Sequence, residues 1–322
     1  MCQVFREGNY MEDINVSSFA SGKATENANI AADTKDGIEK VIVENIPNKV
    51  TQTLCPEYYS EKRENVKYAT KQAITYYSNT TGCERRANIL LPVDYSNNKK
   101  YSVLFYLHGI FGDENSMLEE ANRSEVILGN LIADGIIKDA IVVFPNMYAT
   151  GDPNLQPGFA KEQIVPYDNF INDLVDDLVP YIEANYSVIN DREHRAVIGF
   201  SMGGRETLYI GLMRSDMFSS FAAIAPAPGL VPSKDMMMEH EGQYDSEEAM
   251  SLAYPDSEPE LVIVCCGTND SVVGKFPASY DKILTTNKVD HLWYEVPQAD
   301  HDNNAIKSGY YNFLIRWNAI RK

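Results

Sequence analysis

Long apolar runs and an excess of basic charge are both missing from this sequence of 322 residues. No stretch of about 20 apolar residues occurs, so we expect no transmembrane helix. The formal net charge is −18, which argues against nucleic acids and anionic membranes as partners, because both are bound through basic patches. The acidity by itself identifies no substrate.

Cysteine is also scarce. The five cysteines are Cys2, Cys55, Cys83, Cys265 and Cys266. An odd number without regular spacing excludes a disulfide framework, and no Cys-x-x-Cys pair indicates zinc or another metal. Cys265 and Cys266 end an apolar run, where buried thiols behave as small hydrophobic groups. A bridge between Cys55 and Cys83 stays open.

The chain divides by composition into a polar leader and one larger domain. Residues 1–60 are rich in Asn, Asp, Glu, Ser, Thr and Lys, and we expect a loosely ordered leader or linker there. The first residues lack a charged segment followed by an apolar core, so we expect no signal peptide in this chain. Residues 61–322 are expected to form a single domain, for which a hydrophobic share of 44% supplies an ample core.

The stretch Gly199-Phe200-Ser201-Met202-Gly203 follows the apolar run 196–198 and precedes a helical pattern over 205–212. A serine on so sharp a turn between strand and helix projects its hydroxyl above the sheet, and flanking glycines let the backbones pass closely. This is the nucleophile elbow of α/β-hydrolases. The short Gly-x-Ser-x-Gly pattern also arises by chance in ordinary turns, but a strand before it and a helix after it favour the elbow.

The surrounding pattern predicts an α/β fold with a mainly parallel, doubly wound sheet and helices on both faces. Strands are expected over 72–77, 86–91, 102–107, 140–145, 221–225, 261–265 and 292–296, with turn residues over 79–82. An apolar helical face over 170–182 contains Pro180, which should kink or end the regular helix. A closing amphipathic helix is expected over 306–317. Residues 146–166 are expected to be irregular, and residues 226–258 are expected to form an insertion.

A serine hydroxyl needs a base and a group that orients the base. The five histidines are His108, His194, His240, His291 and His301. His301 alone follows the last strand, in a loop that can reach back over the carboxyl edge of the sheet. Asp270 follows the strand that ends at Cys266, and the order Ser201, Asp270, His301 is that of α/β-hydrolases. Asp300 competes for the role of Asp270, but its position next to His301 in the chain is unfavourable for a hydrogen bond to the imidazole.

Two backbone N–H groups are predicted to form an oxyanion hole. One is Met202, directly after the nucleophile, and the other is Ile110, in the turn that follows the strand over 102–107. His108, at the start of this turn, is then a structural residue. An ordinary turn at the end of a strand is the alternative for His108-Gly109.

The sequence resembles carbohydrate esterase family 1, specifically the feruloyl esterase domains attached to bacterial xylanases. The likeness covers roughly residues 68–318 and rests on the stretches 106–110, 180–201, 266–271 and 301–302. It implies an α/β-hydrolase fold with Ser201 as nucleophile, Asp270 as orienting acid and His301 as base, in agreement with the roles derived above. The family usually has glycines before the catalytic histidine, whereas Gln298-Ala299-Asp300 stand here.

The resemblance also implies the reaction and its setting. Ferulate or p-coumarate would be released from feruloylated arabinoxylan or its oligosaccharides, without metal or cofactor, by a secreted protein. The aromatic acyl group needs an apolar slot, for which Met147 and Tyr148 are candidate liners. Two alternatives stay open: an acetyl-xylan or general short-acyl esterase with the same triad, and a carbohydrate-binding module with a decayed site. The sequence does not indicate an oligomeric state.

Overall fold

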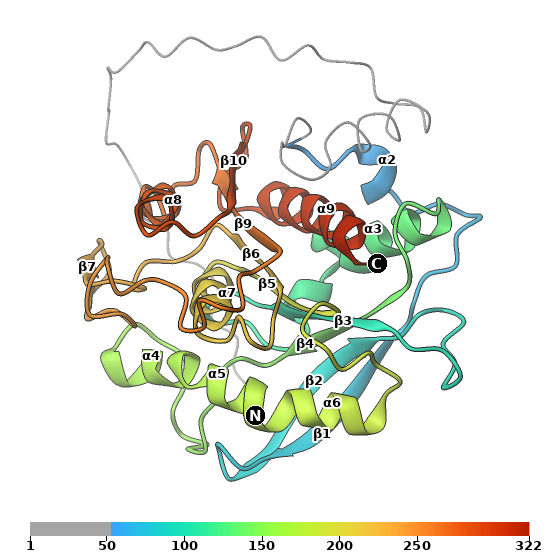
Figure 1. The fold of residues 1–322 in the computed structure, drawn as a ribbon, viewed down its shortest axis with the longest axis horizontal. Helices are drawn as coiled ribbons and strands as arrows, with labels where there is room; N and C mark the ends of the chain where they lie inside the picture. Colours follow the sequence, from blue (N-terminus) through green and yellow to red (C-terminus); the bar gives the residue numbers. More distant parts are fainter. Residues whose placement is uncertain (1–52, 322) are drawn as a thin grey trace, which may run out of the picture.

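An eight-stranded sheet runs through the centre of the computed structural model, which describes residues 53–321 (Figure 1). Most of the leader predicted over 1–60 therefore lies outside the described residues. The strands, in the order in which they lie side by side, are β1 (Lys71–Ser78), β2 (Cys83–Leu90), β4 (Ala140–Pro145), β3 (Ser102–Leu107), β5 (Arg195–Phe200), β6 (Ser220–Ile224), β9 (Leu261–Gly267) and β10 (Leu292–Val296).

The sheet has a parallel part and an antiparallel edge. From β4 to β10 every neighbouring pair is parallel, whereas β1 pairs with β2, and β2 with β4, in antiparallel register. Strands β3, β4, β6 and β9 are buried along their whole length, because helices cover both faces. Strand β1 alternates between exposed and buried residues in its second half, as expected at a half-covered edge.

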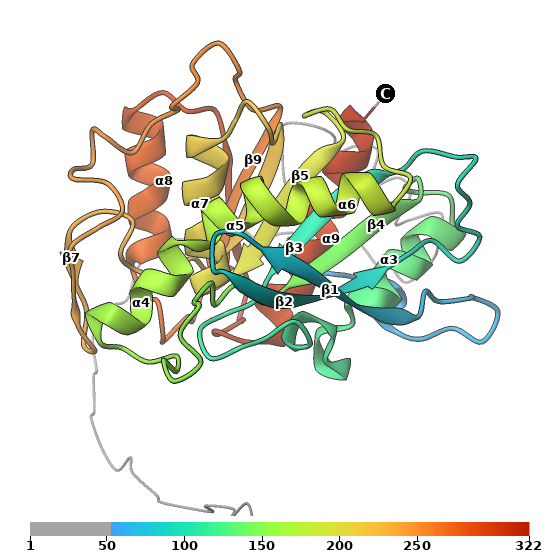
Figure 2. The same ribbon diagram turned by 90° about the horizontal axis from the view of Figure 1, so that it is seen from below.

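Helices form a layer on each face of the sheet (Figure 2). Helix α7 (Met202–Met213), helix α8 (Phe276–Thr286) and the segments α5 (Phe170–Asp173) and α6 (Val179–Asn185) pack on one face. Helix α3 (Ser124–Ala133), helix α9 (Asn303–Ile320) and the short helix α2 (Glu57–Ser60) pack on the other face. Tyr59 of α2 is fully buried and contacts the ring of Tyr311 at a centroid distance of 5.6 Å. None of the helices in residues 53–321 is long and apolar enough to cross a bilayer.

The predicted mainly parallel sheet and the predicted strands are confirmed, and one expectation needs correction. The irregular stretch expected over 146–166 ends earlier, because helix α4 (Lys161–Asp168) begins at Lys161. The helical face over 170–182 is interrupted near Pro180, as expected, since a π-helical segment, η3 (Leu174–Leu178), separates α5 from α6. Pro180 stands at the start of α6, where its missing N–H leaves the preceding turn without a regular hydrogen bond.

The region 226–258 carries only a two-stranded hairpin, β7 (Ser233–Lys234) and β8 (Glu239–His240). The cysteines Cys55, Cys83, Cys265 and Cys266 are free thiols, so the bridge left open between Cys55 and Cys83 does not form. Cys265 and Cys266 are buried as expected, and burial raises the pKa of the Cys265 thiol to about 12.

Candidate active site

Ser201 lies between strand β5 and helix α7 in a strained backbone conformation. Its φ of 58° and ψ of −117° fall in a region that residues with a Cβ rarely adopt. The Ser201 N–H donates to the carbonyl of Ile224 at 2.9 Å, and the Ser201 carbonyl accepts from Ala227 at 3.0 Å. These contacts with the end of β6 hold the turn in place. The geometry is that of a nucleophile elbow.

The two glycines of the elbow are required by close packing. A Cβ at Gly203 would lie 2.5 Å from the carbonyl oxygen of Leu107, and one at Gly199 would lie 2.2 Å from that of Gly203. Both distances are far below contact, and the obstructing atoms belong to the backbone, which cannot move aside. The pattern Gly-x-Ser-x-Gly is therefore explained by sterics at both ends.

Asp270 and His301 come together across the loops that follow β9 and β10. Nδ1 of His301 lies 2.9 Å from Oδ2 of Asp270, and the carboxylate side chain is 1% exposed. The other oxygen, Oδ1, accepts from the N–H groups of Val272 and Val273 at 3.1 and 2.9 Å. Because the carboxylate accepts a hydrogen bond from Nδ1–H, the neutral imidazole presents Nε2 as a hydrogen-bond acceptor.

Pairing with a carboxylate does not by itself distinguish His301. His194, His240 and His291 also contact aspartates, at 2.7, 3.0 and 3.0 Å. What sets His301 apart is its place at the carboxyl edge of the sheet. Its ring packs against that of Phe200, the residue before Ser201, with ring centroids 4.4 Å apart.

Ser201 Oγ makes no hydrogen bond to His301 within residues 53–321. The structure thus brings the aspartate–histidine pair together and places the imidazole beside the elbow, without closing the last contact. In enzymes without substrate this contact is often long and tightens only when substrate binds.

Asp300, the competitor for the role of Asp270, has a different function. Its carboxylate accepts from the N–H and the hydroxyl of Ser271 at 2.7 and 2.9 Å, and from the N–H of His301 at 2.8 Å. Hydrogen bonds from Ser271 and His301 lower the pKa of this carboxyl. Asp300 therefore ties the loop after β10 to the loop that carries Asp270.

The turn after β3 leaves the N–H group of Ile110 available next to the elbow. Gly112 donates to the Gly109 carbonyl at 3.1 Å, and Phe111, with φ of 64°, donates to the Tyr167 hydroxyl at 3.1 Å. Within the described chain, neither Ile110 N–H nor Met202 N–H has a protein acceptor. A Cβ at Gly109 would lie 3.4 Å from the Cβ of Ser201, so this turn adjoins the hydroxyl that Ser201 presents.

His108 is a structural residue in this arrangement. Its side chain is buried, Nδ1 lies 2.7 Å from the Gly109 carbonyl, and Nε2 accepts from the N–H of Met147 at 2.9 Å. Burial lowers the pKa of His108 to about 4. The neutral ring joins the turn after β3 to the segment after β4.

The two candidate liners of the acyl slot differ in their surroundings. Met147 is fully buried in the core, so its side chain offers no accessible surface to a substrate. Tyr148 is 8% exposed, contacts the Tyr167 ring edge to face with centroids 5.0 Å apart, and lines a surface groove beside residues 83–86. The structure does not bring the two side chains together at one cavity.

Sequence reasoning missed the buried charges that follow the elbow. Arg205 contacts Glu206 at 2.6 Å and Asp168 at 2.7 Å, and Gln243 donates to Glu206 at 2.9 Å. Burial raises the pKa of Glu206. This cluster joins α7 to α4 and to the region 226–258. The signal available in the sequence was the adjacent pair Arg205-Glu206, which stands in the first turns of a helix that must pack on the sheet.

No group of three or more His, Cys, Asp or Glu side chains suited to a metal occurs in the described part of the chain. The chemistry available at the elbow is that of a serine nucleophile, an imidazole base with its carboxylate, and two backbone donors.

Comparisons with known proteins agree with this geometry. A family model described as "Putative esterase" matches residues 78–305. A CE1 ferulic acid esterase from Anaeromyces mucronatus, solved in complex with ferulic acid, is 47% identical, with a TM-score of 0.78 over 82% of this chain and 96% of that one. The feruloyl esterase module from Clostridium thermocellum, solved with sinapinate, is 20% identical at a TM-score of 0.63, which shows the shared fold.

Two longer proteins match part of the chain. The endo-1,4-beta-xylanase/feruloyl esterase of Xylanibacter ruminicola is 33% identical over 168 residues, which are 51% of this chain and 22% of that protein. The endo-1,4-beta-xylanase Y of Acetivibrio thermocellus is 28% identical over 148 residues, or 43% of this chain and 12% of that protein. The chain thus spans under a quarter of these relatives.

Proposed function

The chain belongs to the Esterase family, and we propose that it is a feruloyl esterase that releases ferulate or a related hydroxycinnamate from arabinoxylan. The observation that carries this proposal is the 47% identity to a CE1 ferulic acid esterase over 96% of that chain. The arrangement of Ser201, Asp270 and His301 at one edge of the sheet supports it, because an acyl transfer needs a nucleophile, a base and an orienting acid in that place.

In the first half of the reaction, Ser201 Oγ attacks the ester carbonyl carbon and passes its proton to Nε2 of His301. The tetrahedral oxyanion accepts hydrogen bonds from the Ile110 and Met202 N–H groups. Asp270 stabilises the imidazolium that forms and keeps the ring in place. The bond to the arabinose oxygen then breaks, this oxygen takes the proton from His301, and a feruloyl-serine ester remains.

In the second half, water attacks the acyl carbon of this ester and gives its proton to His301. Collapse of the second tetrahedral intermediate returns the proton to Ser201 Oγ and releases the hydroxycinnamate. The sum of the two halves is hydrolysis of one ester bond. No redox step occurs, and each proton that His301 accepts is returned within the same half-reaction.

Turnover of methyl ferulate, compared with p-nitrophenyl acetate, tests this proposal. We expect strong hydrolysis of methyl ferulate by the wild-type protein and its loss in Ser201→Ala. Turnover of the acetate alone would replace the feruloyl assignment by a short-acyl esterase, and turnover of neither would contradict an active hydrolase.

The same substrate class suggests where the protein acts. We propose an extracellular location, because arabinoxylan is a polymer of the plant cell wall and is too large to enter a cell. The expected result is feruloyl esterase activity and this polypeptide in the culture medium of the source organism. Activity confined to the cell lysate would contradict it.

A further inference from the structure

A surface groove adjoins the turn after β3 and has no role in the mechanism above. It consists of two adjoining cavities, of about 360 and 450 Å³, whose linings share Cys83, Asn146, Tyr148 and Thr150. Each volume falls within the range of about 300–1,000 Å³ that is usual for small-ligand sites. We call this the hairpin groove, because the β1–β2 hairpin forms one wall and the segment after β4 forms the other.

One end of the hairpin groove reaches the turn that carries the candidate oxyanion donor. Gly112 lines the larger cavity and is hydrogen-bonded to Gly109, whose Cα adjoins the side chain of Ser201. Met147, next to Asn146, is bonded to His108 at the start of the same turn. An ester whose carbonyl oxygen binds at this turn can therefore extend one of its two parts, the acyl group or the alcohol, into the groove.

The lining of the groove is rich in hydrogen-bonding groups of both kinds. Arg86, with a side chain 70% exposed, and Glu84 stand on the exposed face of β2. Asn146, Thr150 and Gln156 add amide and hydroxyl groups from the opposite wall. An aromatic acyl group needs apolar walls, whereas a sugar presents hydroxyls that both donate and accept.

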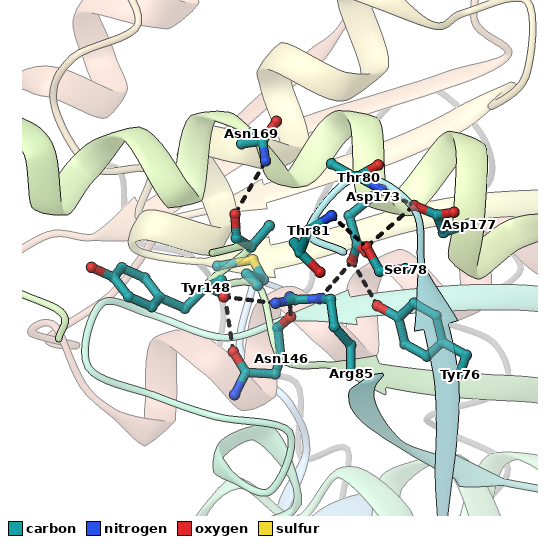
Figure 3. Close-up of polar contacts among 12 residues, drawn as sticks. Tyr76, Ser78, Thr80, Thr81, Arg85, Asn146, Tyr148, Asn169, Asp173 and Asp177 are labelled. Atoms are coloured by element: carbon teal, nitrogen blue, oxygen red, sulfur yellow. Dashed lines mark hydrogen bonds and ion pairs between the residues drawn. The ribbon is translucent and has the colours of Figure 1, made fainter. Parts of the chain in front are cut away.

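Both walls are fixed by buried ion-pair and hydrogen-bond contacts (Figure 3). Arg85 donates to the carbonyls of Asn146 and Tyr148, the latter at 2.7 Å, and its Nε contacts Asp173 at 3.0 Å. Asp173 is fully buried and also accepts from the Tyr76 hydroxyl at 2.6 Å. The segment after β4 is thus held to β2 and to α5.

The hairpin turn is held in the same way. Asp177 accepts from the N–H groups of Asn79 and Thr80 at 2.9 and 3.0 Å, and these bonds, against the opposing effect of burial, lower the pKa of Asp177 to about 2. Because Asp173 directly precedes the π-helical segment η3 and Asp177 lies within it, this segment sets the spacing of the two walls. A groove that is rigid before binding loses little entropy when a ligand enters.

We propose that the hairpin groove binds the carbohydrate part of the ester, a neutral pentose-containing oligosaccharide on the leaving-group side of Ser201. This assignment rests on the proposed feruloyl esterase function. Sugar hydroxyls bond to the Arg86 guanidinium, to Glu84 and to the amide groups of the opposite wall. The aromatic acyl group lies on the other side of the scissile carbonyl, outside the groove.

The test is the ratio of kcat/KM on a feruloylated arabinoxylan oligosaccharide to kcat/KM on methyl ferulate. We expect the double variant Glu84→Ala/Arg86→Ala to lower this ratio about tenfold, mainly through KM, since it removes hydrogen bonds to the sugar. The control is Glu120→Ala/Arg123→Ala, which removes a surface ion pair outside the groove, as the loss of Arg86 removes its ion pair with Glu114, and should leave the ratio unchanged. Thermal unfolding checks that both proteins are folded.

Two results would overturn the inference. One is an unchanged ratio in the groove variant, and the other is an equal fall on both substrates, which would assign the groove to the acyl group or to a structural role. Binding of an arabino-xylo-oligosaccharide without ferulate, measured by calorimetry on Ser201→Ala, separates this inference from the proposed function. If the wild-type protein hydrolyses neither ester, binding that the groove variant abolishes still supports the groove, and binding that it leaves intact contradicts it.

Discussion

Two polar regions of the molecule satisfy their hydrogen bonds to different degrees. Around Arg85 and Asp173, at the antiparallel edge, carboxylate and guanidinium groups meet several partners within hydrogen-bond distance. At the elbow, the Ile110 and Met202 N–H groups have no protein acceptor in the described chain and Ser201 Oγ does not bond to His301. Asp173 Oδ1 is also buried without a hydrogen-bond partner, so an unpaired polar atom does not by itself mark a site. The two N–H groups at the elbow differ because they lie next to Ser201, where the oxyanion of an ester intermediate would accept from them.

The difference separates what the two regions contribute. The Arg85 region contributes stability and shape, and substitutions there should change unfolding before they change chemistry. The elbow contributes chemistry and contains backbone strain at Ser201, so substitutions there should change chemistry with little effect on unfolding. The following predictions test this division.

The largest expected effect is on catalysis at Ser201. Ser201→Ala should lower kcat on methyl ferulate by about 10⁵-fold or more, because loss of the nucleophile removes the acyl-enzyme route. Its melting temperature should stay within about 2 °C of the wild type, since the hydroxyl makes no hydrogen bond to His301. A large fall in the melting temperature would contradict the division between a stabilising Arg85 region and a catalytic elbow.

Asp270→Asn should follow, with a fall in kcat of about 10⁴-fold. The amide cannot stabilise the imidazolium and favours the wrong tautomer of His301. Asp300→Asn is the matched control: its carboxylate bonds to Ser271 and the His301 N–H, so its effect on kcat should be far smaller. Equal losses in the two variants would contradict the assignment of Asp270 as the orienting acid.

Arg85→Met should lower the free energy of unfolding by about 3 kcal/mol, because it leaves the buried Asp173 carboxylate without its cation. Denaturant unfolding measures this loss. The double variant Arg85→Met/Asp173→Asn should lose less than the sum of the two single variants, since the second substitution removes the unpaired charge. Additive losses would show that the two side chains do not act as a pair.

His108 predicts a pH dependence of stability. Its pKa is about 6.5 when unfolded and about 4 when folded, so between these values the unfolded chain binds more protons. The contribution of His108 to stability should therefore fall as the pH is lowered from 6.5 to 4, by roughly 3 kcal/mol. The contribution of Asp177 is lost only below its ordinary pKa of 3.8, so the two ranges are separate. His108→Gln should flatten the slope between pH 6.5 and 4.

The sequence predicted those features that depend on local pattern and on general rules of topology. Ser201 and His301 are 100 positions apart, yet the sequence predicted that they lie close together. Parallel strands end at a common edge of the sheet, and each of these two residues follows one of the strands. The strand predicted over 102–107 coincides with β3, because a continuous apolar run of this length is typical of a strand buried between two helix layers.

The features that could not be predicted depend on contacts between distant segments. Asp173 and Asp177 lie between apolar residues of a helical pattern and resemble exposed positions. They are buried because a hairpin about 97 residues earlier supplies their partners. The start of α4 was not predicted, because a proline is unfavourable inside a helix, yet Pro166 lies inside α4, three residues before its C-cap Asn169.

The most direct test of the account is whether a feruloyl group becomes attached to Ser201 during turnover. The wild-type protein would be mixed with an activated ferulate ester, quenched with acid within one turnover and digested for mass spectrometry. The account predicts a feruloyl adduct on the peptide that contains Ser201, together with a burst of the alcohol product. Product formation with no adduct on that peptide, or an adduct at another residue, would contradict it.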